Sequence, residues 1–155
     1  MPKVMVVYES RYGNTKRVAE AIIQGMRRVE GTEPTLSEIK EVDPNTIRNF
    51  DAIVIGGPNH LGGPTRGVKK FIDKLGKLSS ADKKFAVFDT CLAGGFEMAT
   101  KKMEQRMHEK APSMKSLTTS LSIRVDGMKG PITERELPKA EEFGAKIAAQ
   151  LKTAA

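Results

Sequence analysis

The stretch from Lys3 to Ala21 changes character twice along its length, which limits the folds that are open to the chain. Val4 to Tyr8 is an unalternating apolar run rich in β-branched residues, which is typical of a central parallel strand covered on both faces. After a polar loop, apolar residues recur at steps of three and four, the spacing of one helix face: Val18, Ala21, Ile22 and Met26. The stretch therefore predicts a buried strand, a polar loop and a helix that begins at about Thr15.

The loop between this strand and this helix predicts an anion site. Its side-chain donors are Ser10, Tyr12, Asn14 and Thr15, and Gly13 permits a close backbone approach or a positive φ. Free N–H groups at the helix start and the positive end of the helix dipole favour a phosphate. The sequence contains no Gly-Lys-Ser/Thr after this loop and no G-x-G-x-x-G, so neither a nucleoside-triphosphate loop nor a dinucleotide-binding loop is indicated. An ordinary turn with Thr15 as the helix cap is the alternative interpretation.

The stretch from Ser10 to Thr15 resembles the FMN-phosphate loop of flavodoxins and related FMN-dependent reductases, which usually carries Ser/Thr-x-x-Gly-Asn-Thr. The resemblance continues along almost the whole chain. It implies an α/β fold, the flavodoxin-like three-layer sandwich with a five-stranded parallel sheet of order 2-1-3-4-5. Flavodoxin is itself the standard example of this arrangement, with FMN at the switch point between strands 1 and 3. In this loop the resemblance implies these cofactor-binding residues: Ser10, Arg11, Tyr12, Gly13, Asn14 and Thr15.

The rest of the chain predicts alternating strands and helices within a single domain of residues 1–155. Strands are predicted at residues 4–8, 34–39, 51–56, 83–89 and 117–125. A short helical turn is predicted over residues 45–50, and further helices from about Thr65, from Phe96 to Pro112, and after Thr133. Thr133 and Glu136 have the spacing of a capping box for the last helix. This alternation indicates a parallel sheet covered by helices on both faces.

Two more polar loops follow the third and fourth strands and should meet the first loop at one edge of the sheet. Residues 58–64 resemble the flavodoxin loop on the inner side of the flavin ring, and the resemblance implies contacts from Pro58, Asn59, His60, Leu61, Gly62 and Gly63. In that family a peptide next to a glycine commonly flips on reduction. Gly62 and Gly63 are the candidates here, because a positive φ at the third residue of a turn costs glycine least. The alternatives are a simple tight bend before Pro64 and an exposed, non-stacking His60.

The loop after the fourth strand resembles the outer flavin loop and would contribute Thr90, Cys91, Leu92, Ala93, Gly94 and Gly95. It departs from the family pattern because no tyrosine or tryptophan stands where one usually stacks on the ring. Phe96 is expected in the core as the first apolar residue of the next helix. Cys91 is expected to be a small buried residue rather than a nucleophile, and His108 a surface residue. An open ring face would suit a substrate that stacks on the flavin.

The composition limits the kinds of binding partner to expect for this protein. The net charge is +7 and the sequence pI is about 9.6, which favours an acidic protein partner, a nucleic acid or an anionic surface. Aromatic residues make up only 5% and the cations are scattered over predicted helices, so nucleic-acid binding is not expected. The single cysteine, Cys91, excludes an intramolecular disulfide. Neither a membrane span nor a signal peptide is recognisable, and a cytoplasmic location is expected.

Three functions are compatible with these patterns. The first is an FMN-binding electron-transfer protein that relays electrons between a reductase and an acceptor, docking on partners with an acidic surface. The second is a flavin-dependent NAD(P)H:quinone oxidoreductase of the flavodoxin-like class. The third is a flavodoxin-fold module that has lost its cofactor. No carboxylate pair or Ser/His/Asp set stands out, so hydrolytic chemistry is not indicated, and the flavin would supply the chemistry.

Overall fold

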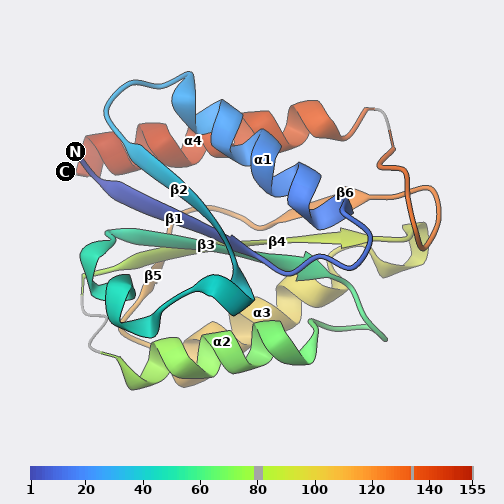
Figure 1. The fold of residues 1–155 in the computed structure, drawn as a ribbon, viewed down its shortest axis with the longest axis horizontal. Helices are drawn as coiled ribbons and strands as arrows, with labels where there is room; N and C mark the ends of the chain where they lie inside the picture. The colour runs from blue at the N-terminus through green and yellow to red at the C-terminus, as the bar shows by residue number, and fades with distance from the viewer. Residues whose placement is uncertain (79–81, 134, 155) are drawn as a thin grey trace.

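The apolar run at the start of the chain forms β1 (Lys3–Tyr8), which pairs in parallel with strands on both sides. The computed structural model describes residues 1–78, 82–133 and 135–154 (Figure 1). The other strands are β2 (Glu33–Glu38), β3 (Ala52–Pro58), β4 (Lys84–Cys91), β5 (Lys115–Ser116) and β6 (Leu121–Arg124). The sheet has the order β2-β1-β3-β4-β5, and β6 also pairs with β4. The predicted parallel sheet and its order 2-1-3-4-5 are therefore confirmed.

Helices cover both faces of this sheet, as Figure 1 shows. On one face lie α1 (Asn14–Arg27) and α4 (Leu137–Ala154), and on the other lie α2 (Arg66–Lys77) and α3 (Met98–Lys110). Three short 3-10 turns are η1 (Ile39–Glu41), η2 (Pro44–Asn49) and η3 (Ala93–Gly95). Arg106 of α3 and Asp73 of α2 form a two-pronged ion pair, with N–O distances of 2.9 and 2.8 Å, that joins the second pair of helices.

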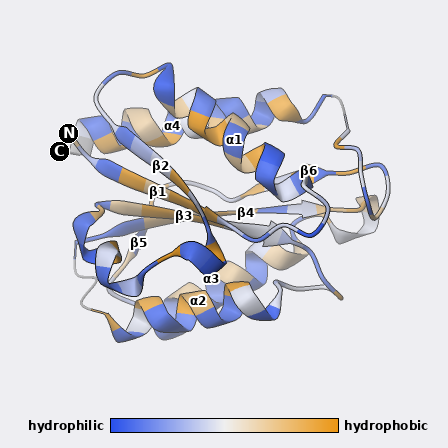
Figure 2. Ribbon diagram, viewed as in Figure 1, coloured by the Kyte–Doolittle hydropathy of each residue, from blue (hydrophilic) through white to orange (hydrophobic). Residues whose placement is uncertain are grey.

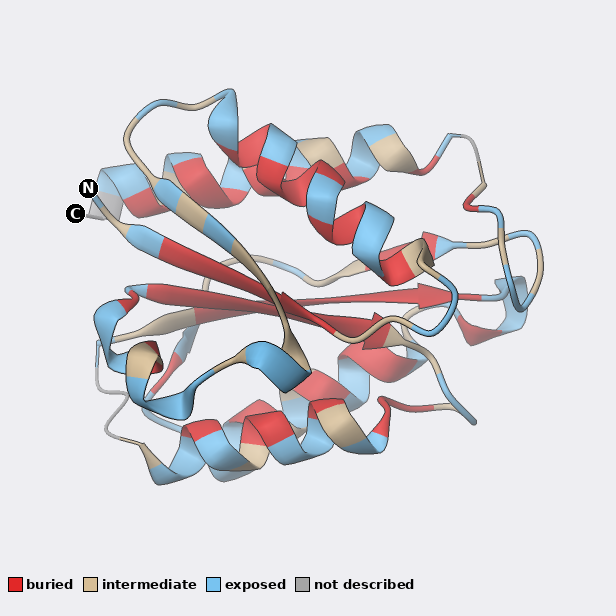
Figure 3. Ribbon diagram, in the orientation of Figure 1, coloured by how far each residue is buried: buried red, intermediate tan, exposed pale blue. Residues whose placement is uncertain are grey.

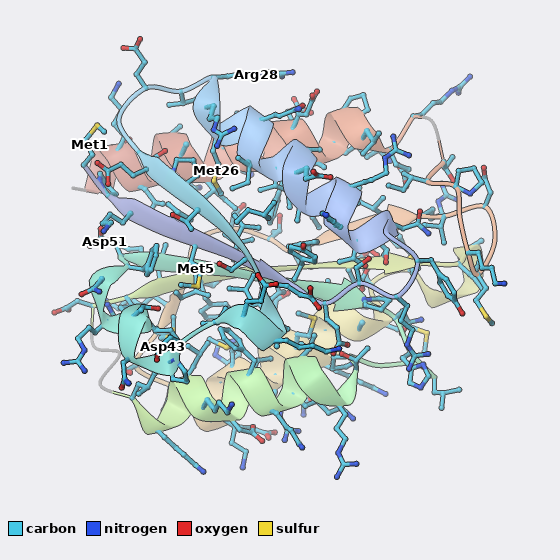
Figure 4. The ribbon with its side chains drawn as sticks, viewed as in Figure 1. Met1, Met5, Met26, Arg28, Asp43 and Asp51 are labelled. Atoms are coloured by element: carbon cyan, nitrogen blue, oxygen red, sulfur yellow. The ribbon has the colours of Figure 1, made fainter. Side chains whose placement is uncertain are left out.

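Two apolar cores lie on the two sides of the sheet, because successive side chains of a strand point to opposite faces. In β1, Val4 and Val6 face α1 and α4, whereas Met5 and Val7 face α2 and α3. Met5 and Met26, labelled in Figure 4, belong to these two different cores. Figure 2 shows apolar colouring along the strands, and Figure 3 shows that the same strands are mostly buried. This burial on both faces explains why the first strand lacks a polar alternation.

The predicted fifth strand, residues 117–125, is wrong in its extent, because two short strands stand in its place. β5 pairs with the start of β4 and β6 with its end; the Leu117 N–H still donates to the Phe85 carbonyl at 2.8 Å, and residues 118–120 lie outside the ladder. Ser116 donates its hydroxyl to the carbonyl of Thr118, at 3.1 Å. Such local side-chain bonds compete with strand pairing, and two threonines and a serine follow in this segment. The other predicted strand ends differ by no more than about two residues.

Two predictions about helix starts are also wrong. Phe96 is not in the core, because it is 49% exposed and α3 begins only at Met98. Thr133 and Glu136 do not form a capping box, because α4 begins at Leu137. Thr133 instead donates to Asp126, and the buried Glu136 carboxylate accepts the Arg124 N–H at 3.0 Å. One oxygen of Glu136 therefore binds the end of β6, and the other pairs with Lys139 in the first turn of α4, 2.6 Å away.

Candidate functional site

A pocket of about 620 Å³ lies at the edge of the sheet where β1, β3, β4 and β6 end. Figure 1 shows that these strands run toward the same side of the molecule. Four segments line the pocket. Their lining residues are Ser10, Arg11, Tyr12, Asn14 and Thr15; Pro58, Asn59, His60, Leu61 and Gly62; Thr90, Cys91, Leu92, Gly94, Gly95 and Met98; and Val125 and Met128. None of these described residues is acidic, so the lining favours a neutral or anionic ligand.

The first loop presents backbone donors to the pocket. Gly13 is the residue before α1 and has a left-handed backbone with φ 90°, and its side-chain position is open. Its N–H donates to the Ser10 hydroxyl at 3.0 Å, while its carbonyl accepts the first helical bond, from Arg17, at 3.1 Å. No side chain caps α1. The N–H groups of the first helical turn are therefore available to an anion.

Thr15 is not the helix cap that the alternative interpretation expected. It lies inside α1, is buried, and its hydroxyl meets that of Thr90 at 3.0 Å. This contact joins the first turn of α1 to the end of β4 in the pocket lining. Because each hydroxyl can donate one hydrogen and accept others, the pair can still offer a donor to a ligand oxygen.

The second loop makes a tight turn over residues 60–63. His60 and Gly63 exchange two backbone hydrogen bonds, at 2.7 and 3.1 Å. Leu61 and Gly62 between them have φ of 51° and 81°. The positive φ predicted at the third residue of this turn is thus found at Gly62 and not at Gly63, and a further one occurs at Leu61. A leucine in this conformation is strained, by roughly 1–2 kcal/mol, and Leu61 is 93% exposed.

Asn59 provides an unpaired buried acceptor in the pocket wall. Its backbone N–H donates to the Thr90 carbonyl at 2.8 Å, but its side-chain Oδ1 is buried without a partner among the described residues. Gly95 makes room for this amide, because a Cβ there would lie 2.2 Å from Asn59 Nδ2. A buried polar atom without a hydrogen bond is costly. A ligand N–H at this wall would satisfy Oδ1.

The third loop contributes aliphatic rather than aromatic walls. Leu92 and Met98 line the pocket and are partly exposed, whereas Cys91 is almost fully buried. Burial raises the pKa of the Cys91 thiol, so the group stays protonated and the expectation of a small buried residue holds. His60 lines the pocket and is exposed, and His108 is exposed on α3, as predicted.

The predicted cofactor-binding residues and the pocket lining largely coincide in place. Gly13, Gly63 and Ala93 are the predicted residues that do not line it, although the first two shape its loops. As FMN ligands all of them remain predictions. Sequence reasoning missed Met98, Val125 and Met128. Met98 is the residue that begins α3, two residues later than the sequence suggested, and the other two follow from β6 lying beside β4.

The segment after β6 packs directly on the first loop. The Lys129 ammonium lies 5.9 Å from the centre of the Tyr12 ring. A Cβ on Gly130 would lie 2.6 Å from Asn14 Oδ1, so only glycine permits this approach. The two glycines of residues 126–131, Gly127 and Gly130, are the signal in the sequence for this contact.

The family profile described as a flavodoxin domain matches residues 5–143. The chain belongs to the flavodoxin family. Its sheet order, its uncapped α1 and its loops at the carboxyl edge are thus those of a flavodoxin-family protein, and FMN is the cofactor of this family's proteins. None of the described helices of this flavodoxin-family chain is long and apolar enough to cross a membrane.

Individual relatives agree with the family. A flavodoxin of Aquifex aeolicus is 37% identical over 75 residues, which is 48% of this chain and 40% of the relative. An NAD(P)H dehydrogenase (quinone) of Chromohalobacter salexigens is 31% identical over 104 residues, which is 54% of this chain and 52% of the relative. The chain thus spans about half the length of these two relatives. A solved flavodoxin from the domain Archaea has 26% identity and a TM-score of 0.83, covering 97% of this chain and 99% of its own.

Proposed function

We propose that this protein is an electron carrier of the cytoplasm that binds one FMN in the pocket and relays electrons between a reductase and an acceptor protein. Residues 1–155 act as a single domain in this proposal. The observation that carries it is the pocket itself: an uncapped helix start at one end, an unpaired buried acceptor in the wall, and no acidic lining residue. A flavin mononucleotide has the matching parts, a phosphate at one end and a ring with an N–H at the other.

Each part of the pocket has a role toward the cofactor. The first-turn N–H groups of α1 and the hydroxyls of Ser10 and Thr15 bind the phosphate. Asn59 Oδ1 accepts a hydrogen bond from the ring edge. Leu92 and Met98 pack on the ring as aliphatic walls. FMN supplies the redox chemistry when bound, while these residues hold and orient it.

The phosphate assignment is tested by Thr15→Val, which removes the hydroxyl and keeps the buried shape. A lost hydrogen bond to a charged group should weaken FMN roughly ten- to a hundredfold and leave riboflavin, which lacks the phosphate, almost unchanged. Thr46→Val is the matched control, because the Thr46 hydroxyl donates to the Asp43 carbonyl outside the pocket. Equal losses for FMN and riboflavin, or FAD released from the purified protein, would defeat the assignment.

An apolar collar surrounds the pocket mouth and favours docking of a protein partner. We define the collar as Tyr12, Leu61, Leu92, Phe96, Met98 and Met128, which are all but one of the exposed large apolar side chains among the described residues. Contiguous exposed apolar groups of this kind mark interaction sites. Leu61 stands out, because it is strained and almost fully exposed, and so contributes no burial to the fold.

The charges beside the collar favour an acidic partner. Arg11 lines the pocket, the Lys102 side chain lies against Gly62 and Gly63, and Lys129 lies over Tyr12. Glu97 and Asp126 are the nearby carboxylates on the same loops. Together with the net charge of +7, this excess of cations should steer an acidic protein toward the pocket mouth.

Docking can be tested with two protein probes of opposite charge. The reduced protein should reduce succinylated, acidic cytochrome c faster than the native basic cytochrome, and the advantage should shrink as salt rises. Lys102→Glu should reduce the preference, whereas Lys74→Glu, on the far half of α2, should leave it largely intact. A preference for the basic cytochrome, or one insensitive to salt, would argue against an acidic partner.

A second function is favoured by one relative and one feature of the pocket. The relative from Chromohalobacter salexigens carries the name of an NAD(P)H dehydrogenase (quinone), and the aliphatic walls leave room for a flat substrate to stack on the ring. In that case the protein would be a flavin-dependent NAD(P)H:quinone oxidoreductase. NADPH consumption with a small quinone and no added reductase separates this function from that of a carrier. A protein that takes up no flavin at all would instead be a module without cofactor.

A further inference from the structure

Asp89, at the end of β4, is a fully buried carboxylate that the proposed function does not use. Among the described residues none forms an ion pair with it. Its oxygens accept the Ser122 hydroxyl at 2.5 Å and the Thr100 N–H at 3.0 Å. A buried carboxylate without a cation is expensive to keep ionised, so a position such as this calls for an explanation.

A chain of hydrogen bonds connects Asp89 to the pocket wall. Ser122 has a single hydroxyl hydrogen, which it donates to Asp89. The Cys91 Sγ atom lies 3.4 Å from Ser122 Oγ. Because the Ser122 hydrogen is already used, the Cys91 thiol must be the donor in this contact. Cys91 lines the pocket, so two hydrogen bonds separate its wall from the buried carboxylate. Each member of the chain can both donate and accept once Asp89 is protonated, which gives a proton a path inward.

We propose that Asp89 is a proton-binding residue coupled to the charge in the pocket, and that it takes up a proton from solvent when the flavin is reduced. The inference rests on the proposed FMN site. Two electrons come from the reductant, one proton adds to the ring, and the ring is left with one more negative charge. A second proton from solvent converts the Asp89 carboxylate to the acid, which offsets that charge. No other bond is made or broken.

The electrostatics of the surroundings fit this role. Burial raises the pKa of Asp89 to about 6, although the hydrogen bonds from Ser122 and Thr100 act in the opposite direction. A small further rise of this pKa therefore brings it to neutral pH. Glu97, on the loop before α3, raises the pKa further. Charges on the other neighbouring elements are Lys101 and Lys102, exposed on α3, and the Arg124–Glu136 pair at the end of β6. From β3, the register partner of Asp89 is the uncharged Gly57.

The direct test is a carbon-13 NMR titration of the Asp89 carboxyl group in the apoprotein, the oxidised FMN complex and the reduced FMN complex. The midpoint should lie near pH 6 in the apoprotein. On reduction it should rise by about one pH unit, the size expected for one charge at roughly 10 Å with an effective dielectric constant of about 20. Histidines also change charge in this range, so the titration is repeated in a His60→Asn background.

The reciprocal effect appears in the reduction potential. Asp89→Asn should raise the potential relative to the unmodified protein above about pH 7, and the difference should vanish near pH 5, where both proteins carry a neutral group. Ser122→Ala removes a bond that lowers the Asp89 pKa, so it should move the titration to higher pH, and it serves if the first variant does not fold. Asp73→Asn, the same chemical change in the ion pair of α2 with α3, should leave the potential unchanged.

The outcomes separate the two proposals. A protein that binds FMN but shows the same Asp89 midpoint in both redox states overturns this inference alone. A potential difference between Asp89→Asn and the unmodified protein that is constant with pH does the same. A protein that binds no FMN overturns the proposed function and the inference with it.

Discussion

The stability of the apoprotein should record the cost of keeping Asp89 ionised. A carboxyl group whose pKa rises from its ordinary 3.8 to about 6 destabilises the folded state, when ionised, by about 3 kcal/mol, at about 1.36 kcal/mol for each pH unit. The folded protein binds this proton more tightly than the unfolded chain does. The protonated Asp89 therefore stabilises the folded state fully below about pH 4, and this stabilisation is lost as pH rises through about 6.

Urea unfolding of the unmodified protein and of Asp89→Asn at several pH values measures this cost. The unfolding free energy of the variant, minus that of the unmodified protein, should increase by about 2.5 kcal/mol between pH 4 and pH 7. Because both proteins share every other titrating group, the comparison isolates Asp89, whatever the asparagine itself does to packing.

Asp73→Asn provides a control of opposite sign. The hydrogen bond from Arg106 lowers the pKa of Asp73, so its contribution is present near neutral pH and is lost as pH falls. The same free-energy difference for this variant should therefore decrease, not increase, as pH rises from about 2 to about 5, and it should be nearly constant between pH 4 and pH 7. If the Asp89 difference stays constant over this range, the carboxylate does not carry the cost assigned to it, and the reasoning is refuted.

Three further predictions concern packing, the ring and the collar. Gly25→Ala should lower the unfolding free energy by about 1–3 kcal/mol, because a Cβ there would lie 1.8 Å from the Glu141 carbonyl oxygen of α4. Gly94→Ala is the control, because a Cβ at Gly94 would meet only open space and should change the unfolding free energy little. Equal effects of the two substitutions would contradict the close helix contact. Leu92→Tyr should tighten FMN by about 0.5–1.5 kcal/mol in a fluorescence titration, and no gain would place the ring elsewhere. Leu61→Asn should raise the unfolding free energy by about 1 kcal/mol, because asparagine tolerates a positive φ better than leucine does. The same substitution should slow electron transfer to the acidic cytochrome. A loss of stability would mean that Leu61 has an unrecognised role in the fold.

Local periodicity, glycines and polar residues predicted the strands and the three main loops well, whereas the sheet order was implied by the resemblance to flavodoxins. Val4 to Tyr8 could be recognised as central since a strand buried on both faces has no polar alternation. Gly62 could be recognised because a positive φ favours glycine. Both signals lie within a few residues of the feature that they predict.

The features that the sequence did not reveal depend on contacts between distant residues. Phe96 looked like the start of a helix face. The first turn of α3 is instead fixed by the hydrogen bond from the Thr100 N–H to Asp89 of β4, and Phe96 remains in the preceding loop, exposed to solvent. Met128 enters the pocket because β6 pairs with β4 and brings its following loop onto the first one. Periodicity carries no information about such long-range partners.

The most direct test of the FMN site is a two-dimensional amide NMR titration of the apoprotein with FMN. We expect saturation at one FMN per chain, with the largest shifts at residues 13–16, 59–62, 90–98 and 125–128, which border the pocket. Riboflavin should shift the last three groups while leaving residues 13–16 nearly unmoved, because the phosphate is missing. Shifts that centre on another part of the molecule, or no saturable shift at all, would contradict the assignment of this pocket to FMN.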